Sequence, residues 1–505
     1  MMLEYSAGGC DALMVIEDLK QYRFRPQYSP EWGSGGIFGL RYHRGFLYFM
    51  LSFEARAYFI SRDLYKEYDL NLVGPPPRSG GDTYNASDAI DNKIFFGGWV
   101  HAPIRFIPSD RRIDFSSKYS HLHYFDIDNL EIRIIWKESA GNRDTWVGEI
   151  SNILYDPVEQ RLLVSRADGS QNLGVYSVSL DGTSIRLSDR PSLKGALLGD
   201  QACFDISEGF EGFKGLQCLD LIDKKWIYRI PGDRRKISVD GAGFRKAGVG
   251  VVAPLYGRIL TFVRGGYIVW EPWEKEGEDL YFIRLFDLPP SDYGPLRTSY
   301  TPLGGGIVVP FNSYTHGVLR PKSEEERVFA RSFNTPAAPT LLLYLTPPTI
   351  RILCPLGARV TSLESVGEKM ILGVNTAPNT GGGDATPLDL GERSLLIINA
   401  DSLLNTCRSS FVIKVRGSDV RQERWGGIPL TSVKRALLNI YAGKGNMLRI
   451  YEYDASLPPS FLGVDSYRIN SGKNSIDLSS YRNIVSMELE EVDEKANIYI
   501  ALDLG

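Results

Sequence analysis

The sequence predicts an all-β fold of the β-propeller class, and three observations lead to this prediction. Short apolar or alternating runs recur along the chain, turn residues separate them, and convincing amphipathic helices are nearly absent. The pattern is clearest at 146–187, where four such runs fall within about 40 residues, the size of one propeller blade. We expect seven blades, with eight as the alternative.

The unit at 146–187 shows the strand and turn signals most fully. Its four runs are 150–155, 161–165, 174–180 and 183–187. The third run alternates Val175, Ser177 and Ser179 with the residues between them, as a strand with two different faces does. Asp181-Gly182 then separates the last two runs, and Asp-Gly between two strands is a strong hairpin signal. A four-stranded antiparallel sheet is therefore predicted here.

Similar units precede and follow this one. They cover 37–60, 85–136, 196–230, 248–286, 306–345 and 359–415. We expect residues 32–415 to hold the blades and residues 1–31 to supply strands that close the ring. Residues 416–505 are read either as a last blade with closing strands or as a C-terminal β accessory. A sheet of four strands cannot bury both apolar faces alone, so packing sheets around an axis is favoured. A pair of β-sandwich domains is the main rival fold.

Bulk composition indicates a water-soluble globular protein. The 505 residues are 43% hydrophobic and 23% charged, and the formal net charge is −4. This balance argues against a nucleic-acid partner, because no excess of basic charge is present. No run reaches the ~18 apolar residues of a membrane helix, and acids interrupt the first 18 positions, unlike a signal peptide. We therefore expect a cytoplasmic protein with no membrane partner.

The cysteines and the rarer residue types add two expectations. The five cysteines form no CxxC pair, which argues against a zinc knuckle. Cys203 and Cys218 could meet across one blade, although two separate buried thiols are the simpler interpretation. Only seven glutamines and seven methionines occur. Thermolabile residues are depleted in proteins from hot environments, so a thermophilic source is expected.

Signatures of enzymes are missing from the chain. It has no phosphate-binding GxxxxGK[ST] loop, no HExxH, no GxSxG, and no GxGxxG between a strand and a helix. The glycine runs at 304–306 and 381–383 are read as flexible loops, since no helix follows either. Long irregular loops at 75–81 and 378–390 offer contact surface instead.

A histidine group is one candidate site. Three of the five histidines, His101, His121 and His123, fall within 23 residues. His121 and His123 are two apart in a predicted strand and therefore project from the same face. Such a group could bind a divalent metal, contact a ligand or serve packing among Trp99 and other aromatic neighbours.

Carboxylates near the predicted inner strands form a second candidate site. Asp88 and Glu149 stand at such positions, and the inner strands of a propeller line its axis. Convergent acids there could bind a cation or act in acid/base chemistry, or they could only accept bonds from loop amides. The chosen ligand-binding candidates are His101, Glu149, Asp88, His121, His123, Trp99 and Trp146. No cofactor is predicted, a divalent metal is the option kept open, and no catalytic residue is assigned.

Three segments resemble an uncharacterised archaeal β-propeller family, a domain of unknown function. They are 82–103 (DTYNASDAIDNKIFFGGWVHAP), 119–123 (YSHLH) and 146–174. The resemblance covers about the first three quarters of the chain and is weakest beyond Arg416. It implies a propeller from an archaeal source and carries no activity. More loosely, Gly148-Glu149 is similar to the acid on an inner strand of lactonase-like propellers.

The expected function is that of a non-enzymatic scaffold, a propeller that binds a protein partner or a small ligand. The alternative is a hydrolase or lactonase-like enzyme with a metal or acid/base site at the mouth of the central channel. Whether the chain is an enzyme, and its oligomeric state, are left open by the sequence.

Overall fold

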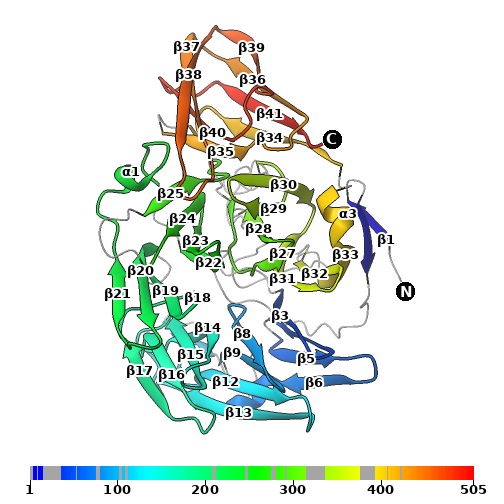
Figure 1. Cartoon of the computed structure of the whole chain (residues 1–505), viewed down its shortest axis with the longest axis vertical. Coiled ribbons are helices and arrows are strands. Elements are labelled where there is room, and N and C mark those ends of the chain that lie inside the picture. The colour runs from blue at the N-terminus through cyan, green and yellow to red at the C-terminus, as the bar shows by residue number, and fades with distance from the viewer. Residues whose placement is uncertain are drawn as a thin grey trace.

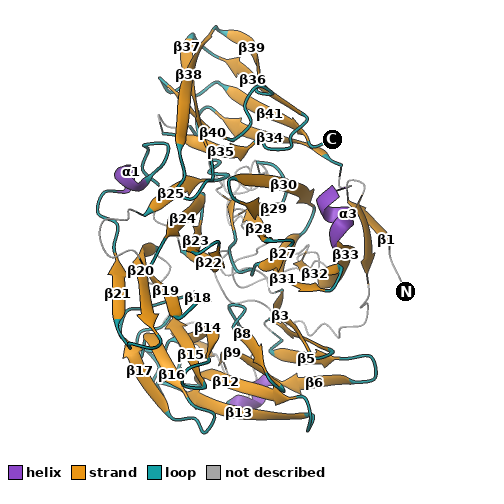
Figure 2. Cartoon of the chain, viewed as in Figure 1, coloured by secondary structure: helices purple, strands orange, loops and turns teal. Residues whose placement is uncertain are grey.

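The computed structural model is built almost entirely of antiparallel strands (Figures 1 and 2). It describes residues 4–7, 10–14, 36–52, 54–75, 80–101, 105–107, 112–207, 212–244, 248–273, 280–289, 293–313, 336–375, 393–405, 408–420 and 423–505. The helices of this part are short, namely η2 (Leu70–Val73), α1 (Arg234–Ile237) and α3 (Ala400–Asn405). None of them is long and apolar enough to cross a membrane.

The first half of the chain forms four successive sheets. The first contains β3 (Ile37–His43), β4 (Phe46–Leu51), β5 (Arg56–Ile60) and β6 (Tyr65–Asp69). The second contains β7 (Gly81–Asp82), β8 (Ser87–Ile90), β9 (Lys93–His101), β12 (Lys118–Asp126) and β13 (Glu131–Glu138). The third contains β14 (Glu149–Asp156), β15 (Arg161–Ala167), β16 (Gly174–Val178) and β17 (Ser184–Ser188). The fourth contains β18 (Gly195–Leu198), β19 (Gln201–Ser207), β20 (Phe213–Asp220) and β21 (Trp226–Arg229). A separate pair, β10 (Arg105–Ile107) and β11 (Arg112–Asp114), lies between β9 and β12 in the chain.

Three further sheets continue the pattern. One contains β22 (Val249–Leu255), β23 (Arg258–Val263), β24 (Gly266–Trp270) and β25 (Tyr281–Arg284). The next contains β26 (Tyr293–Gly294), β27 (Thr301–Leu303), β28 (Gly306–Ser313), β29 (Thr340–Thr346) and β30 (Thr349–Leu356). The last contains β31 (Arg359–Val366), β32 (Lys369–Asn375) and β33 (Arg393–Asn399).

One inner strand of each sheet lies nearest the neighbouring sheets. Contacts run from β3 to β8, from β8 to β14, from β14 to β18 and from β18 to β22, and β27 contacts β31. The β22–β25 and β26–β30 sheets are joined through one shared buried core, which contains Val251 and Ile307. The series returns to its start because β31 packs against β3. The sheets therefore surround a common axis (Figure 1), and their faces pack against one another as the expected burial of two apolar faces requires.

The N-terminal strands complete the last of these sheets. β1 (Glu4–Ala7) and β2 (Cys10–Met14) form a hairpin, and β2 pairs with β33. The strand expected at 22–26 lies outside the described residues. One sheet is thus assembled from segments near the two ends of the ring.

The C-terminal strands form two more sheets that share one apolar core. The first has the order β34 (Ser410–Arg416), β41 (Asn497–Asp503), β36 (Arg435–Ala442) and β39 (Gly472–Asp477). The second has the order β35 (Trp425–Pro429), β40 (Ile484–Leu489), β37 (Asn446–Tyr453) and β38 (Phe461–Ile469). Buried residues of both sheets belong to one cluster, which extends into the β22–β25 and β26–β30 sheets. β35 contacts β25 and β30, so this pair of sheets is joined to the side of the ring.

The third sheet shows how local sequence produces the fold. Asp181-Gly182 makes the predicted turn between β16 and β17, with Gly182 at φ +88°, a conformation that favours glycine. The Asp181 carboxylate accepts the Thr183 amide proton at 2.9 Å and stabilises the turn. In the next sheet, Cys203 stands opposite Cys218 and the two form a disulfide. The favoured interpretation as two separate buried thiols was therefore wrong, because the register of β19 and β20 places the two side chains directly opposite each other.

Candidate functional site

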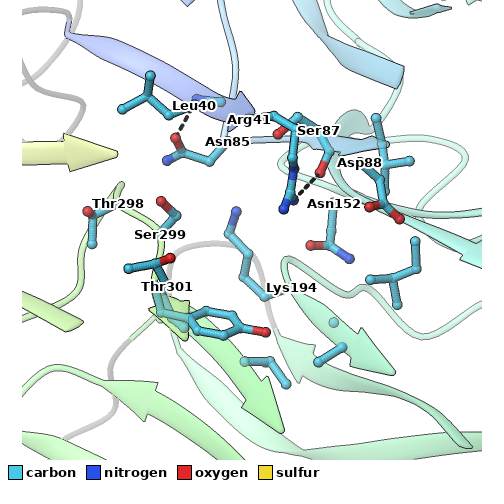
Figure 3. Close-up of a pocket in the computed structure, with 18 of the residues that line it drawn as sticks. Leu40, Arg41, Asn85, Ser87, Asp88, Asn152, Lys194, Thr298, Ser299 and Thr301 are labelled. Atoms are coloured by element: carbon cyan, nitrogen blue, oxygen red, sulfur yellow. Dashed lines mark hydrogen bonds between the residues drawn. The ribbon is translucent and has the colours of Figure 1, made fainter. Parts of the chain in front are cut away.

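A cavity of about 330 Å³ lies on the axis, where the inner strands of the successive sheets meet (Figure 3). Its wall takes residues from β3, β8, β14, β18, β22, β27 and β31. This placement follows from the architecture, because one inner strand of each sheet lines the cavity. The lining residues that carry polar or charged groups are Arg41, Asn85, Ser87, Asp88, Asn152, Lys194, Thr298, Ser299, Tyr300, Thr301 and Glu364.

Charges of both signs face this cavity. The Arg41 guanidinium lies 3.7 Å from the Glu364 carboxylate and donates to the Ser87 carbonyl at 3.0 Å. Burial raises the pKa of Glu364, and it raises the pKa of Tyr300 to about 12. The Arg41 side chain is still 37% exposed, so a molecule in the cavity can reach it.

Four polar atoms of the cavity lining have no hydrogen-bond partner among the described residues. They are Arg41 Nε, Asn152 Nδ2, Thr298 Oγ1 and Thr301 Oγ1, all shielded from solvent. Buried polar groups are normally paired, so four unpaired ones among the residues that line one cavity point to a polar guest that could reach them. The first two atoms are N–H donors, and the two hydroxyls can donate or accept.

Lys194 reaches into the same cavity from the start of β18. Figure 3 shows its side chain extending into the pocket, with the amine directed toward the side of Asn85 and Arg41. The amine donates to the Ser151 carbonyl at 3.1 Å and to the Tyr84 carbonyl. Burial lowers the pKa of Lys194 to about 7, and Asp205 partly offsets this effect.

A wider depression of about 570 Å³ adjoins the cavity. Both are lined by Pro254, Tyr300 and Pro302. Leu198, at the end of β18, also lines the depression, whereas Lys194 precedes the start of that strand. At ~3.3 Å per strand residue, Lys194 and Leu198 are separated by roughly 13 Å along the strand. The depression therefore adjoins the cavity at the end of β18 that is farther from Lys194.

Asp88 is the one predicted candidate that lines the cavity. Its Oδ1 accepts the Ala89 amide proton and its Oδ2 accepts that of Tyr155, each at 2.9 Å. The second bond ties β8 to β14. The Asp88 carboxylate therefore accepts hydrogen bonds from backbone amides, which is the structural role considered for it in the sequence.

Glu149 does not reach the cavity. It is fully buried at the start of β14, where its carboxylate accepts from the Lys118 ammonium. Burial raises the pKa of Glu149 well above its usual range; Lys118 opposes the rise and Asp168 adds to it. The pair joins the β14–β17 sheet to β12.

Trp99 and Trp146 surround the same ammonium. Lys118 Nζ lies 4.6 Å from the centre of the Trp99 ring and 5.3 Å from that of Trp146. Phe115 stacks on Trp146 with ring centres 4.3 Å apart. Three of the predicted candidates are thus together, but around a lysine of the chain itself rather than around a ligand.

His121 and His123 lie inside the packing between sheets. The two rings contact each other edge to face, with Nδ1 atoms 3.2 Å apart, as side chains on the same face of one strand can do. His123 stacks on Phe96 at 5.2 Å, and the Tyr68 hydroxyl of β6 lies 3.5 Å from its Nε2. Burial lowers the pKa of His121 to about 3 and that of His123 well below its usual range. This is the packing role that the sequence left open.

Of the predicted histidines and carboxylates, Glu149, His121 and Asp88 do not come together at the channel. Glu149, His121 and Asp88 occupy three different environments, and β12 is separated from the axis by β9. His101 pairs with Lys118 across β9 and β12, and its side chain lies outside the described residues. In the described part of the chain, no group of three or more His, Cys, Asp or Glu side chains could hold a metal ion.

The sequence missed Lys194, Arg41, Glu364 and Tyr300. Lys194 and Arg41 stand beside strands that carry no motif, and only the register of several sheets brings them together. The sequence does contain one usable signal, namely a charged residue just before or within a predicted inner strand. Only acids and histidines were considered as site candidates on this basis, so the lysine and the arginine were overlooked.

The closed series of sheets and its axial cavity define an all-β protein of the β-propeller class. The chain belongs to the family described as "Uncharacterized protein conserved in archaea (DUF2139)", whose model matches residues 47–383. This match confirms the family resemblance seen at 82–103, 119–123 and 146–174.

Solved structures similar to this chain are β-propellers. YCF48 from Cyanidioschyzon merolae has 8% identity and a TM-score of 0.40, with 74% of this chain and 99% of that chain covered. The β-propeller domain of the Trilobed protease from Pyrococcus furiosus has 10% identity and a TM-score of 0.36, with 73% and 96% covered. The N-terminal domain of Nup159 has 9% identity and a TM-score of 0.38, with 79% and 97% covered. No curated protein matches the chain.

Proposed function

We propose that the seven described sheets from β3–β6 to β31–β33 are the blades of one propeller, and that its axial cavity binds a small hydroxylated molecule. The observation that carries this proposal is the set of four unpartnered polar atoms in residues that line the cavity. Hydroxyl groups both donate and accept, so one such ligand can satisfy N–H donors and threonine hydroxyls together.

The charge of the lining supports a ligand with little net charge. Arg41 is balanced by Glu364 at 3.7 Å, and Asp88 is bonded to two amides. A strongly charged guest would leave one of these side chains beside a like charge. A volume of about 330 Å³ is at the small end of ligand pockets, which favours a small polyol or sugar over a peptide.

Saturation-transfer NMR with erythritol tests this function. We expect erythritol to bind the wild-type protein, and Asn152→Leu to weaken binding by about threefold to tenfold through loss of one hydrogen bond. Arg41→Met is expected to have at least that effect. Arg468→Met, which changes an exposed arginine of β38, is the matched control and should bind normally. Binding that survives both cavity substitutions would refute the proposed site.

Two alternative functions predict different experimental results. A hydrolase of the lactonase kind would carry stoichiometric metal, which elemental analysis of the purified protein detects. A scaffold for a protein partner would use surface loops; of the loops expected for this role, residues 76–79 and 378–390 lie outside the described residues. Partner binding that is unchanged by the cavity variants would favour the scaffold.

A further inference from the structure

The Lys194 amine is held in place by the backbones of two other sheets. It donates to Ser151 O of β14 and to Tyr84 O, which precedes β8. Lys194 is 7% exposed, and no ion pair joins it to a carboxylate of the described residues. Carbonyl oxygens accept from either the charged or the neutral amine, so this setting does not demand the ammonium form.

A buried carboxylate fixes the backbone on which Lys194 stands. Asp205 Oδ1 accepts the amide protons of Leu193 at 2.9 Å and of Lys194 at 2.6 Å. Ser207 donates to the other oxygen, and Asp205 is fully buried. The start of the lysine side chain and its amine are therefore both anchored, and the amine faces a cavity rather than packed atoms.

We propose that Lys194 forms a Schiff base with a small hydroxylated aldehyde or ketone that enters the axial cavity. This inference rests on the proposed function, because the hydroxyl groups of the ligand would occupy the sites described above. The inference adds that one carbon of the ligand is a carbonyl carbon and that this carbon binds Lys194 covalently and reversibly.

The chemistry balances without any further reactant. The neutral amine attacks the carbonyl carbon, a C–N bond forms, and the oxygen takes a proton to give a carbinolamine. Loss of that oxygen as water then gives the imine, and the reverse reaction restores both partners. With a pKa of about 7, roughly half of Lys194 is neutral at neutral pH, against less than about 0.1% of an ordinary lysine.

Other side chains that line the cavity could contact the ligand and transfer protons. Tyr300 lines both the adjoining depression and the cavity, and Arg41, Glu364 and Asp88 also line the cavity. Burial raises the pKa of Glu364 and Arg41 opposes the rise, so Glu364 is the carboxyl of this lining with the environment of a general acid. These are the titratable groups that face the cavity besides Lys194, and Asp205 lies behind it.

Reductive trapping of the wild-type protein tests the inference. The protein is incubated with glyceraldehyde and cyanoborohydride, and peptide mass spectrometry measures the rate of modification at each lysine. At pH 7 we expect Lys194 to react at least about tenfold faster than Lys225, which is 78% exposed. Its rate should rise with pH around an apparent pKa near 7, and excess erythritol should suppress it.

The outcomes separate this inference from the proposed function. If erythritol binds but Lys194 reacts no faster than Lys225, the Schiff base is refuted and the binding function stands. If Lys194 reacts quickly and erythritol gives no protection, the amine is reactive without recognition, and the inference is also overturned. If erythritol does not bind at all and Lys194 is inert, both proposals are wrong. The use of wild-type protein avoids any loss of folding in a Lys194 variant.

Discussion

The Thr361 hydroxyl exchanges two hydrogen bonds with the backbone of Ile37, a residue 324 positions earlier in the chain. It accepts from Ile37 N at 3.1 Å and donates to Ile37 O at 2.7 Å. Thr361 lies in β31 and Ile37 in β3, so these bonds join the last sheet of the ring to the first. Both residues are buried, and water cannot replace the lost partner.

Thr361→Val should therefore weaken the closure of the ring. The substitution preserves the shape and leaves the Ile37 amide without its side-chain partner, whereas the Ile37 carbonyl still accepts from the Ser362 hydroxyl at 2.6 Å. We therefore expect a loss of about 1–3 kcal/mol in the free energy of unfolding. Urea denaturation followed by tryptophan fluorescence measures it. Thr361→Ser retains the hydroxyl and should lose less. Equal stability of Thr361→Val and the wild type would contradict the role assigned to these bonds.

Lys118→Met should destabilise the protein more than the removal of both partners. It leaves the Glu149 carboxyl buried without its cation, at an expected cost of about 3–5 kcal/mol near neutral pH. The double variant Lys118→Met with Glu149→Gln has no unpaired charge and should recover part of this loss. Chemical denaturation of the wild type, the two single variants and the double variant gives the coupling free energy between Lys118 and Glu149. Additive effects would show that the two side chains act independently.

The buried histidine pair predicts a loss of stability in acid. His121 and His123 are neutral in the folded chain, because burial lowers both pKa values, whereas in the unfolded chain they take up protons near pH 6.5. The unfolded state thus binds more protons, and stability falls as the pH decreases from about 6.5 toward 3, the lower limit set by His121.

Replacing both histidines by glutamine should flatten this pH dependence. Each histidine that no longer titrates removes up to about 1.4 kcal/mol per pH unit from the slope. His43→Gln, a change near the surface, is the control and should keep the wild-type slope. An unchanged slope in the double variant would mean that these two rings are not the source of acid sensitivity.

Reduction of the disulfide should lower thermal stability. Cys203 and Cys218 are 15 residues apart, and a loop of that length is worth about 3 kcal/mol by its effect on the unfolded chain. The variant with alanine at both positions should melt at a lower temperature and lose its response to a reducing agent. Cys354→Ala lacks only a separate buried thiol and should still respond. Alkylation of Cys203 in the unreduced, unfolded protein would show that the bond is absent.

Local structure was the part most open to prediction. The runs between 146 and 187 correspond to β14–β17, and the turn at Asp181-Gly182 lies where its chemistry requires. These features depend on neighbours in the sequence, so a single sequence is enough. The pairing of β34 with β41 is different, because no local signal joins residues so far apart, and the C-terminal sheets could be read as a blade or an accessory.

The composition of the site was much harder to predict. The spacing of His121 and His123 correctly placed the two rings on one face, but that face packs toward Tyr68 of the preceding sheet rather than toward the axis. In this ring of sheets, one inner strand of each sheet lines the cavity. Lys194 shows the converse case. Its surroundings arise from the carbonyls of Tyr84 and Ser151, and backbone groups carry no sequence signature.

The pairing of β2 with β33 has a consequence for synthesis on the ribosome. The β2 strand ends at Met14 and β33 begins at Arg393, and the difference, 393 − 14, is 379 residues. At roughly 5–20 residues per second, β33 emerges about 20–75 s after β2. Through that interval the nascent hairpin has no sheet to join, and its hydrogen-bonding edge is open to neighbouring polypeptides. This sheet can therefore be completed only after β33 has been synthesised, and until then a chaperone could protect the exposed edge of β2.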